Sequence, residues 1–235
     1  MTTMNTHGVT MMRTFLTIVL SMALGPLFAR AEPFASIAPF LDDREAAAVG
    51  ARLGIGSARL EGPTVVEVLT RQTWTLEYAA GRAGIAPGGG VRIAMRHVIQ
   101  WSPPQTEDPA ADGYLTVAAG NDVPTCVFVD YKNKGRRFFD RYHPWQNLIE
   151  IVLPKRGLRE GETIRVTYGD RSGGSKGIRI QPFDESPFVF KVYVDPRGDD
   201  VYYPLIENPT IEIVAAAPYR LSVVMPSDAV VGEPT

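Results

Sequence analysis

The stretch that decides the fold is residues 158–196, LREGETIRVTYGDRSGGSKGIRIQPFDESPFVFKVYVDP. Two apolar sets in it alternate with other residues: Ile164, Val166 and Tyr168, and then Phe188, Phe190, Val192 and Val194. Alternation with a period of two is typical of half-buried strands. Between the two sets lies the segment 169–177, GDRSGGSKG, which is polar and rich in glycine and is expected to be a connecting loop. The stretch therefore predicts a β-sheet centre with one elaborate loop.

Candidate strands lie within this stretch and on both sides of it. They are Val65–Leu69, Gln72–Ala79, Val91–Val98, Tyr114–Ala118, Thr125–Tyr131, Leu148–Leu153, Thr163–Tyr168, Ile178–Gln181, Phe188–Val194 and Thr210–Val214. Glycine, proline and asparagine clusters separate them, as turns do. Many short strands with frequent turns predict an all-β protein, an antiparallel β-sandwich of the immunoglobulin or jelly-roll kind, with an open barrel as the alternative. No helical pattern is long enough for the crossovers of a parallel α/β sheet.

The first 31 residues have the pattern of a secretory signal peptide. Arg13 precedes the apolar run FLTIVLSMAL (15–24), Gly25-Pro26 breaks that run, and Ala29-Arg30-Ala31 has the small residues of a cleavage site. The apolar run is too short to span a bilayer comfortably. We therefore expect a periplasmic or secreted protein, with a mature chain that begins near Glu32 and no stable membrane insertion after cleavage.

Two flanking segments complete the predicted domain organisation around a sandwich at 64–214. In the lead-in 32–63, Asp42–Leu53 is either a short helix capped by Asp42 or Asp43 or part of an extended strap around the sandwich. Residues 215–235 comprise the linker Ala215–Pro218 and an alternating strand, Tyr219–Met225. A lone strand is not stable. This strand either pairs back onto the sandwich or, as we favour, begins a further immunoglobulin-like domain that is incomplete here.

Charge and cysteine content exclude some function classes. The formal net charge is -2 over 235 residues, so the sequence indicates no general affinity for nucleic acid. Cys126 is the single cysteine and lies in an apolar run. It therefore cannot form an internal disulfide, and it is expected to be a small buried residue rather than a nucleophile.

A surface candidate for ligand binding lies at Gly135–Trp145, where cationic and aromatic residues alternate. Arg137, Arg141, His143 and Trp145 suit carbohydrate rings or an acidic small molecule, through stacking and bidentate hydrogen bonds. The alternative is that the aromatic residues of this segment plug one end of the sandwich while the arginines remain in water. Trp101 with Gln105 is a second candidate.

We predict no catalytic residue, cofactor or metal. His97, His143, Asp130 and Asp140 have no spacing that brings them together as ligands. Asp195, Asp199 and Asp200 have the oxygen ligands that calcium favours, but a solvated turn is the preferred interpretation because EF-hand spacing is missing. The loop 169–177 leads into a strand rather than a helix, so it lacks the amides of a phosphate-binding loop.

Several blocks are similar to the N-terminal region of the exported bacterial "domain of unknown function 3604" family. The blocks are GIAPGGGVRIA (84–94), WSPPQ (101–105) with Asp108-Pro109, Gly113-Tyr114, Gly161-Glu162, Gly169-Asp170, Arg179–Phe183, FVFKV (188–192), Pro226-Ser227 and Gly232-Glu233-Pro234. This resemblance implies an N-terminal β module that is followed, in full-length members, by a metal-dependent hydrolase-like domain of the PHP type. The clustered histidines of such a domain are missing here, because only His97 and His143 follow His7.

These observations predict a non-catalytic accessory β-sandwich of an exported protein. Its partner would be a hydrolase-like domain encoded downstream, which the resemblance implies. The alternative is a stand-alone carbohydrate-binding or adhesion module that uses the cationic and aromatic segment.

Overall fold

The computed structural model describes residues 42–96, 99–130 and 145–217. Its one α-helix, α1 (Asp43–Leu53), begins at Asp42, whose carboxylate accepts the N–H of Glu45 at 2.8 Å. It ends at Gly54, where the left-handed φ of 78° suits a residue without a side chain. Of the two alternatives for this segment the helix is confirmed, with Asp42 as the cap.

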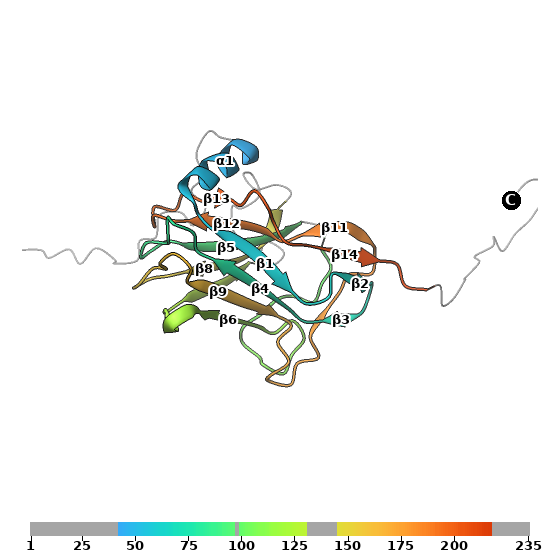
Figure 1. Cartoon of the computed structure of the whole chain (residues 1–235). Helices are drawn as coiled ribbons and strands as arrows, with labels where there is room; N and C mark the ends of the chain where they lie inside the picture. Colours follow the sequence, from blue (N-terminus) through green and yellow to red (C-terminus); the bar gives the residue numbers. More distant parts are fainter. Residues whose placement is uncertain (1–41, 97–98, 131–144, 218–235) are drawn as a thin grey trace, which may run out of the picture. The chain divides into compact units, whose positions relative to one another are not determined.

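Two antiparallel sheets form the layers of a β-sandwich (Figure 1). The four-stranded sheet has the order β1 (Ser57–Glu61), β4 (Trp74–Ala79), β9 (Thr163–Tyr168) and β6 (Leu115–Ala119). The five-stranded sheet has the order β13 (Tyr203–Pro204), β12 (Lys191–Asp195), β5 (Gly90–Arg96), β8 (Trp145–Val152) and β7 (Cys126–Asp130). The predicted sandwich is thus confirmed, and β1 shows that the lead-in also contributes a strand.

The core lies between these sheets and is built by the alternating residues of both. Its four-stranded side includes Trp74, Leu76, Tyr78, Ile164 and Val166, and its five-stranded side includes Val91, Ile93, Ile149, Ile151, Val192 and Val194, all fully or almost fully buried. Burial at this depth stabilises a fold by about 1.5–3 kcal/mol for each large apolar side chain. The burial of these alternating apolar side chains is therefore the main source of the fold's stability.

Two small sheets extend this body (Figure 1). One contains β11 (Glu185–Val189), β14 (Thr210–Val214) and β2 (Val65–Glu67), and the other pairs β10 (Ile178–Arg179) with β3 (Arg71–Gln72). A 3-10 turn, Gly120–Asp122, follows β6. The pairing of β14 with β2 is parallel, which is an exception to the antiparallel pattern that we expected.

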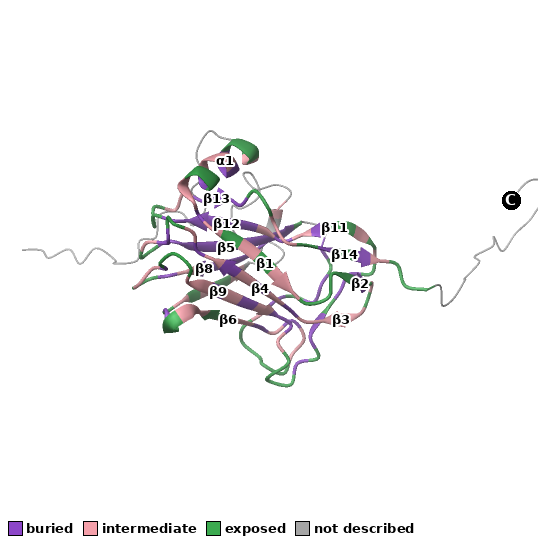
Figure 2. Cartoon of the chain, in the orientation of Figure 1, coloured by how far each residue is buried: buried purple, intermediate pink, exposed green. Residues whose placement is uncertain are grey.

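Two strands differ from their predictions for identifiable physical reasons. The predicted strand Phe188–Val194 breaks at Phe190, whose N–H donates to the carbonyl oxygen of Pro209 at 2.9 Å, so the chain passes from one sheet to another. Strand β5 ends at Arg96 rather than at the predicted Val98, and it is buried on both faces up to Met95 (Figure 2), so Arg92 is fully buried. Within the described residues, no helix is both long and apolar enough to cross a membrane.

Candidate functional site

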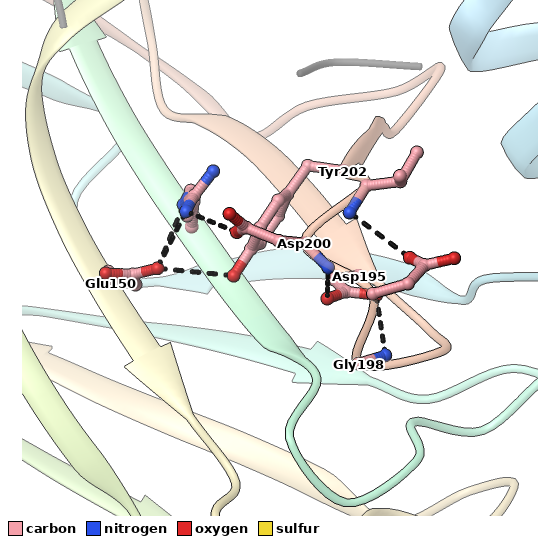
Figure 3. A network of polar contacts seen from close by, with 8 residues as sticks. Glu150, Asp195, Gly198, Asp200 and Tyr202 are labelled. Carbon is pink, nitrogen blue, oxygen red and sulfur yellow. Dashed lines mark hydrogen bonds and ion pairs between the residues drawn. The ribbon is translucent and has the colours of Figure 1, made fainter. Parts of the chain in front are cut away.

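A buried ionic network on the outer face of the five-stranded sheet is the candidate site (Figure 3). Arg92 of β5 and Glu150 of β8 lie directly opposite each other in the antiparallel register. The Arg92 guanidinium donates through Nε and Nη2 to Oε1 of Glu150, at 3.1 and 2.9 Å. The same Nη2 atom contacts Oδ1 of Asp200 at 3.0 Å. One cation therefore joins two strands to the loop that follows β12.

The ring of Tyr202 covers the guanidinium group of Arg92. Its ring centroid lies 3.6 Å from Cζ of Arg92, within the range of a cation–π interaction. Its hydroxyl donates to Oε1 of Glu150 at 3.3 Å. Burial raises the pKa of the Tyr202 hydroxyl well above its ordinary value, opposed by the positive charge of Arg92. The hydroxyl therefore stays protonated and acts as a donor.

Asp195 fixes the loop that carries Asp200 and Tyr202. Its carboxylate accepts the backbone N–H groups of Arg197, Gly198 and Asp200 at 3.0, 2.8 and 2.9 Å. Burial raises the pKa of this carboxyl, and the three N–H donors act in the opposite direction. Asp195 itself is only 1% exposed, whereas Arg197, Gly198 and Asp199 of the same turn are exposed, as the predicted solvated turn requires.

The arrangement of the network is suited to holding a loop against a sheet. Arg92, Glu150, Asp195 and Tyr202 are all at most 3% exposed. Buried charges require opposite charges and hydrogen bonds in compensation. Arg92 and Glu150 supply both to each other, and backbone N–H groups supply the hydrogen bonds of Asp195. Within the described residues, no three His, Cys, Asp or Glu side chains are arranged to hold a metal ion.

The second predicted binding pair, Trp101 with Gln105, has a structural role. Trp101 is 2% exposed and stacks between Trp74 and Phe188, with ring centroids 5.2 and 4.6 Å away. Gln105 accepts the N–H groups of Glu107 and Asp108 through Oε1, both at 2.8 Å, and so stabilises a turn. These positions make Trp101 a core residue and not a surface for stacking.

Trp145 begins β8 and is partly buried beside the network. It packs against a small apolar group on the same outer face, which consists of Ala94, Leu148, Tyr193 and Tyr202. Arg137, Arg141 and His143 lie outside the described residues, as do His97 and Asp140. Binding through this segment therefore stays a prediction.

An exposed cysteine and a mostly apolar pocket lie on the surface of the described part of the chain. Cys126 on the edge strand β7 is exposed, so the expectation that it is buried was wrong. A pocket of about 260 Å³ lies between α1, the start of β1 and the chain after β13. Its lining is mostly apolar: Ala51, Ile55, Gly56, Ser57, Pro204, Leu205, Ile206 and Glu207.

The network itself was missed by sequence reasoning. Its members come from β5, from β8 and from the loop after β12, so they are widely separated in the chain. Arg92 and Glu150 each follow the alternation of an ordinary half-exposed strand. Only the pairing register, which a sequence pattern does not contain, brings them together.

Comparisons with known proteins give only remote structural likenesses. No protein-family model and no curated protein matches the chain. A cohesin module from a family 33 glycoside hydrolase of Clostridium perfringens aligns with a TM-score of 0.37 and 10% identity, over 69% of this chain and 99% of that one. A structure titled "AvmM Catalyzes Macrocyclization in Alchivemycin A Biosynthesis" aligns with a TM-score of 0.36 and 11% identity, over 72% and 93%.

Proposed function

We propose that this chain is a non-catalytic accessory β-sandwich module of an exported protein. Its partner is a metal-dependent hydrolase-like domain that the same gene encodes further downstream. The resemblance of the glycine, proline and aromatic blocks to the N-terminal region of an exported family supports the partner and the compartment. The proposal assigns to the sandwich a scaffolding role rather than a chemical step.

The observation that carries the scaffolding role is the buried ionic network around Arg92. A catalytic arginine or carboxylate must reach its substrate. Here the guanidinium of Arg92 faces Glu150, Asp200 and the ring of Tyr202, and Arg92 itself is fully buried. These contacts join the loop of residues 195–202 to the sheet.

Reading the gene beyond the codon for Thr235 tests the partner domain. We expect the reading frame to continue into a region with clustered histidines and carboxylates. The longer protein should then bind a divalent transition metal stoichiometrically, measured by elemental analysis, while the 235-residue chain should not. A stop codon without any adjacent hydrolase-like frame would remove the proposed partner. Stoichiometric metal on the 235-residue chain would overturn the accessory role.

A further inference from the structure

The edge strand β1 of the four-stranded sheet has an open side. It pairs with β4 on one side, and among the described residues no strand pairs with its other side. The N–H of Ala80, just after β4, donates to the carbonyl oxygen of Glu162, just before β9, so the even-numbered residues of β4 face β9 and the odd-numbered ones face β1. Their partners in β1 are Ser57, Arg59 and Glu61. The backbone groups of Ala58 and Leu60 therefore point to the open side, where another strand can pair with them.

The side chains on the outer face of β1 alternate in charge. Arg59 forms ion pairs with Glu61 at 2.9 Å and with Glu77 of β4 at 2.8 Å. Arg165 of β9 pairs with Glu61 at 2.8 Å and also with Glu77. The side chain of Arg59 is nevertheless 63% exposed and that of Glu61 39% exposed. The open edge therefore presents one cation and one anion, two residues apart, and each has surface left for a further partner.

A second copy of the same strand complements this edge. When two identical strands pair antiparallel about a two-fold axis, the position of the axis fixes which residues lie opposite each other. An axis at Leu60 places Arg59 of each copy opposite Glu61 of the other, and it brings together the unpaired backbone groups of the two Leu60 residues. An axis at Arg59 or at Glu61 would instead oppose two like charges, which is destabilising. The charge pattern therefore selects one register of self-pairing.

Apolar surface adjoins the same edge. Ser57 at the start of β1 lines the pocket of about 260 Å³, and Ile206 in the same lining is 64% exposed. Antiparallel pairing brings the end of β1 in one copy, with the exposed Pro63 that follows it, beside the start of β1 in the other. The contact can therefore bury apolar surface on both sides of its charged centre, in keeping with the composition of specific interfaces.

We propose that two copies of this chain associate through β1, as antiparallel strands with the two-fold axis at Leu60. The two four-stranded sheets then form one continuous sheet. This association goes beyond the accessory role and is independent of any downstream hydrolase-like domain. Because β1 has only five residues, the interface is small, and we expect a dissociation constant of about 1–100 µM.

Sedimentation velocity of the purified protein over a series of concentrations tests the association. We expect a shift from the mass of one chain to twice that mass. A contact about a two-fold axis closes on itself, so larger species should not follow. A protein that is still monomeric at about 1 mM, well above the expected dissociation constant, would overturn the proposal.

Two charge substitutions test the register. Arg59→Glu alone places acidic side chains opposite each other across the axis, and Glu61→Arg alone places basic ones opposite each other. Each variant should therefore dimerise at least about tenfold more weakly than the unmodified chain. Mixed in equal amounts, the two variants should form a heterodimer, because every pair across the axis then has opposite charges. A variant that had failed to fold could not give this rescue.

Glu107→Arg is the matched control. It makes the same change of charge as Glu61→Arg, at an exposed residue in the connection to β6, which is the opposite edge strand of the sheet. The dissociation constant should stay within about twofold of the unmodified value. Dimers that persist in both single variants would place the contact elsewhere and sink the assignment. A mixture of the two variants that stays monomeric would reject the register.

Discussion

Among the charged residues, Arg92 is the one whose substitution should lower the free energy of unfolding most. Removing one partner of a buried ion pair leaves an uncompensated buried charge, which costs about 3–5 kcal/mol. We expect Arg92→Met to reduce the free energy of unfolding by that amount, because Glu150 and Asp200 would lose their common donor. Denaturant unfolding followed by intrinsic fluorescence measures the difference.

Arg59→Met is the matched control for this prediction. Arg59 also forms an ion pair, to Glu77 at 2.8 Å, but its side chain is 63% exposed. Exposed pairs contribute little, because water and salt screen their charges. Equal losses for the two variants would contradict the view that the network around Arg92 holds the loop.

Glu162 should give the protein a pH dependence in the acid range. Its carboxylate accepts the N–H of Arg159 at 2.8 Å and the amide of Asn121 at 2.7 Å, and it also pairs with Arg156. The Arg159 N–H first, and then the other two partners, lower the pKa of Glu162 from 4.5 to about 2. Stability from this group is fully present above the unfolded value. It is lost as the pH falls from 4.5 through about 2.

We therefore expect the difference in free energy of unfolding between the unmodified chain and Glu162→Gln to shrink as the pH is lowered across that range. Glu160→Gln removes the same charge at an exposed position two residues away and is the matched control. Urea unfolding at a series of pH values gives both curves. A difference that is independent of pH would show that the ionised carboxylate contributes nothing.

At the scale of elements, the sequence predicts strands well where one face alone is buried. β9 and β14 were predicted with their observed bounds, because their apolar and polar residues alternate without interruption. β1 was missed because its burial pattern is weak, with only Ala58 and Leu60 partly packed on the core. The split between β11 and β12 could not be predicted, because the hydrogen bond from Phe190 to Pro209 depends on tertiary structure.

The connection from α1 to β1 provides a test at this scale. Gly56 has a φ of 110°, and a Cβ atom there would overlap the carbonyl oxygen of Ala79. Gly161 also has a positive φ, of 80°, but a Cβ atom there would meet nothing within 4 Å. Gly161→Ala should cost roughly 1–2 kcal/mol of backbone strain. Gly56→Ala should cost clearly more, since the α1–β1 connection or β4 must move. Thermal unfolding of both variants measures this, and equal costs would contradict the close approach.

For the whole molecule, the layers were predictable but the face that holds the ionic network was not. Alternation indicates that a strand has a buried side, but it does not show that a second side is covered as well. In β5 the outward residues Arg92 and Ala94 are as deeply buried as the inward Val91 and Ile93. The loop of residues 195–202 contributes to that cover through Tyr202, and its position depends on Asp195 rather than on any repeating pattern.

Export is the last property to test on the molecule as a whole. The charged start, the apolar run and the small residues at Ala29 and Ala31 predict recognition and cleavage by a secretory system. Expressed with its own leader in a Gram-negative bacterium, the protein should appear in the periplasm, and N-terminal sequencing should begin near Glu32. Leu20→Arg places a charge in the apolar run and should leave the uncleaved chain in the cytoplasm. A full-length chain retained in the cytoplasm without any substitution would contradict export. Equal export of the Leu20→Arg variant would show that the apolar run is not the signal.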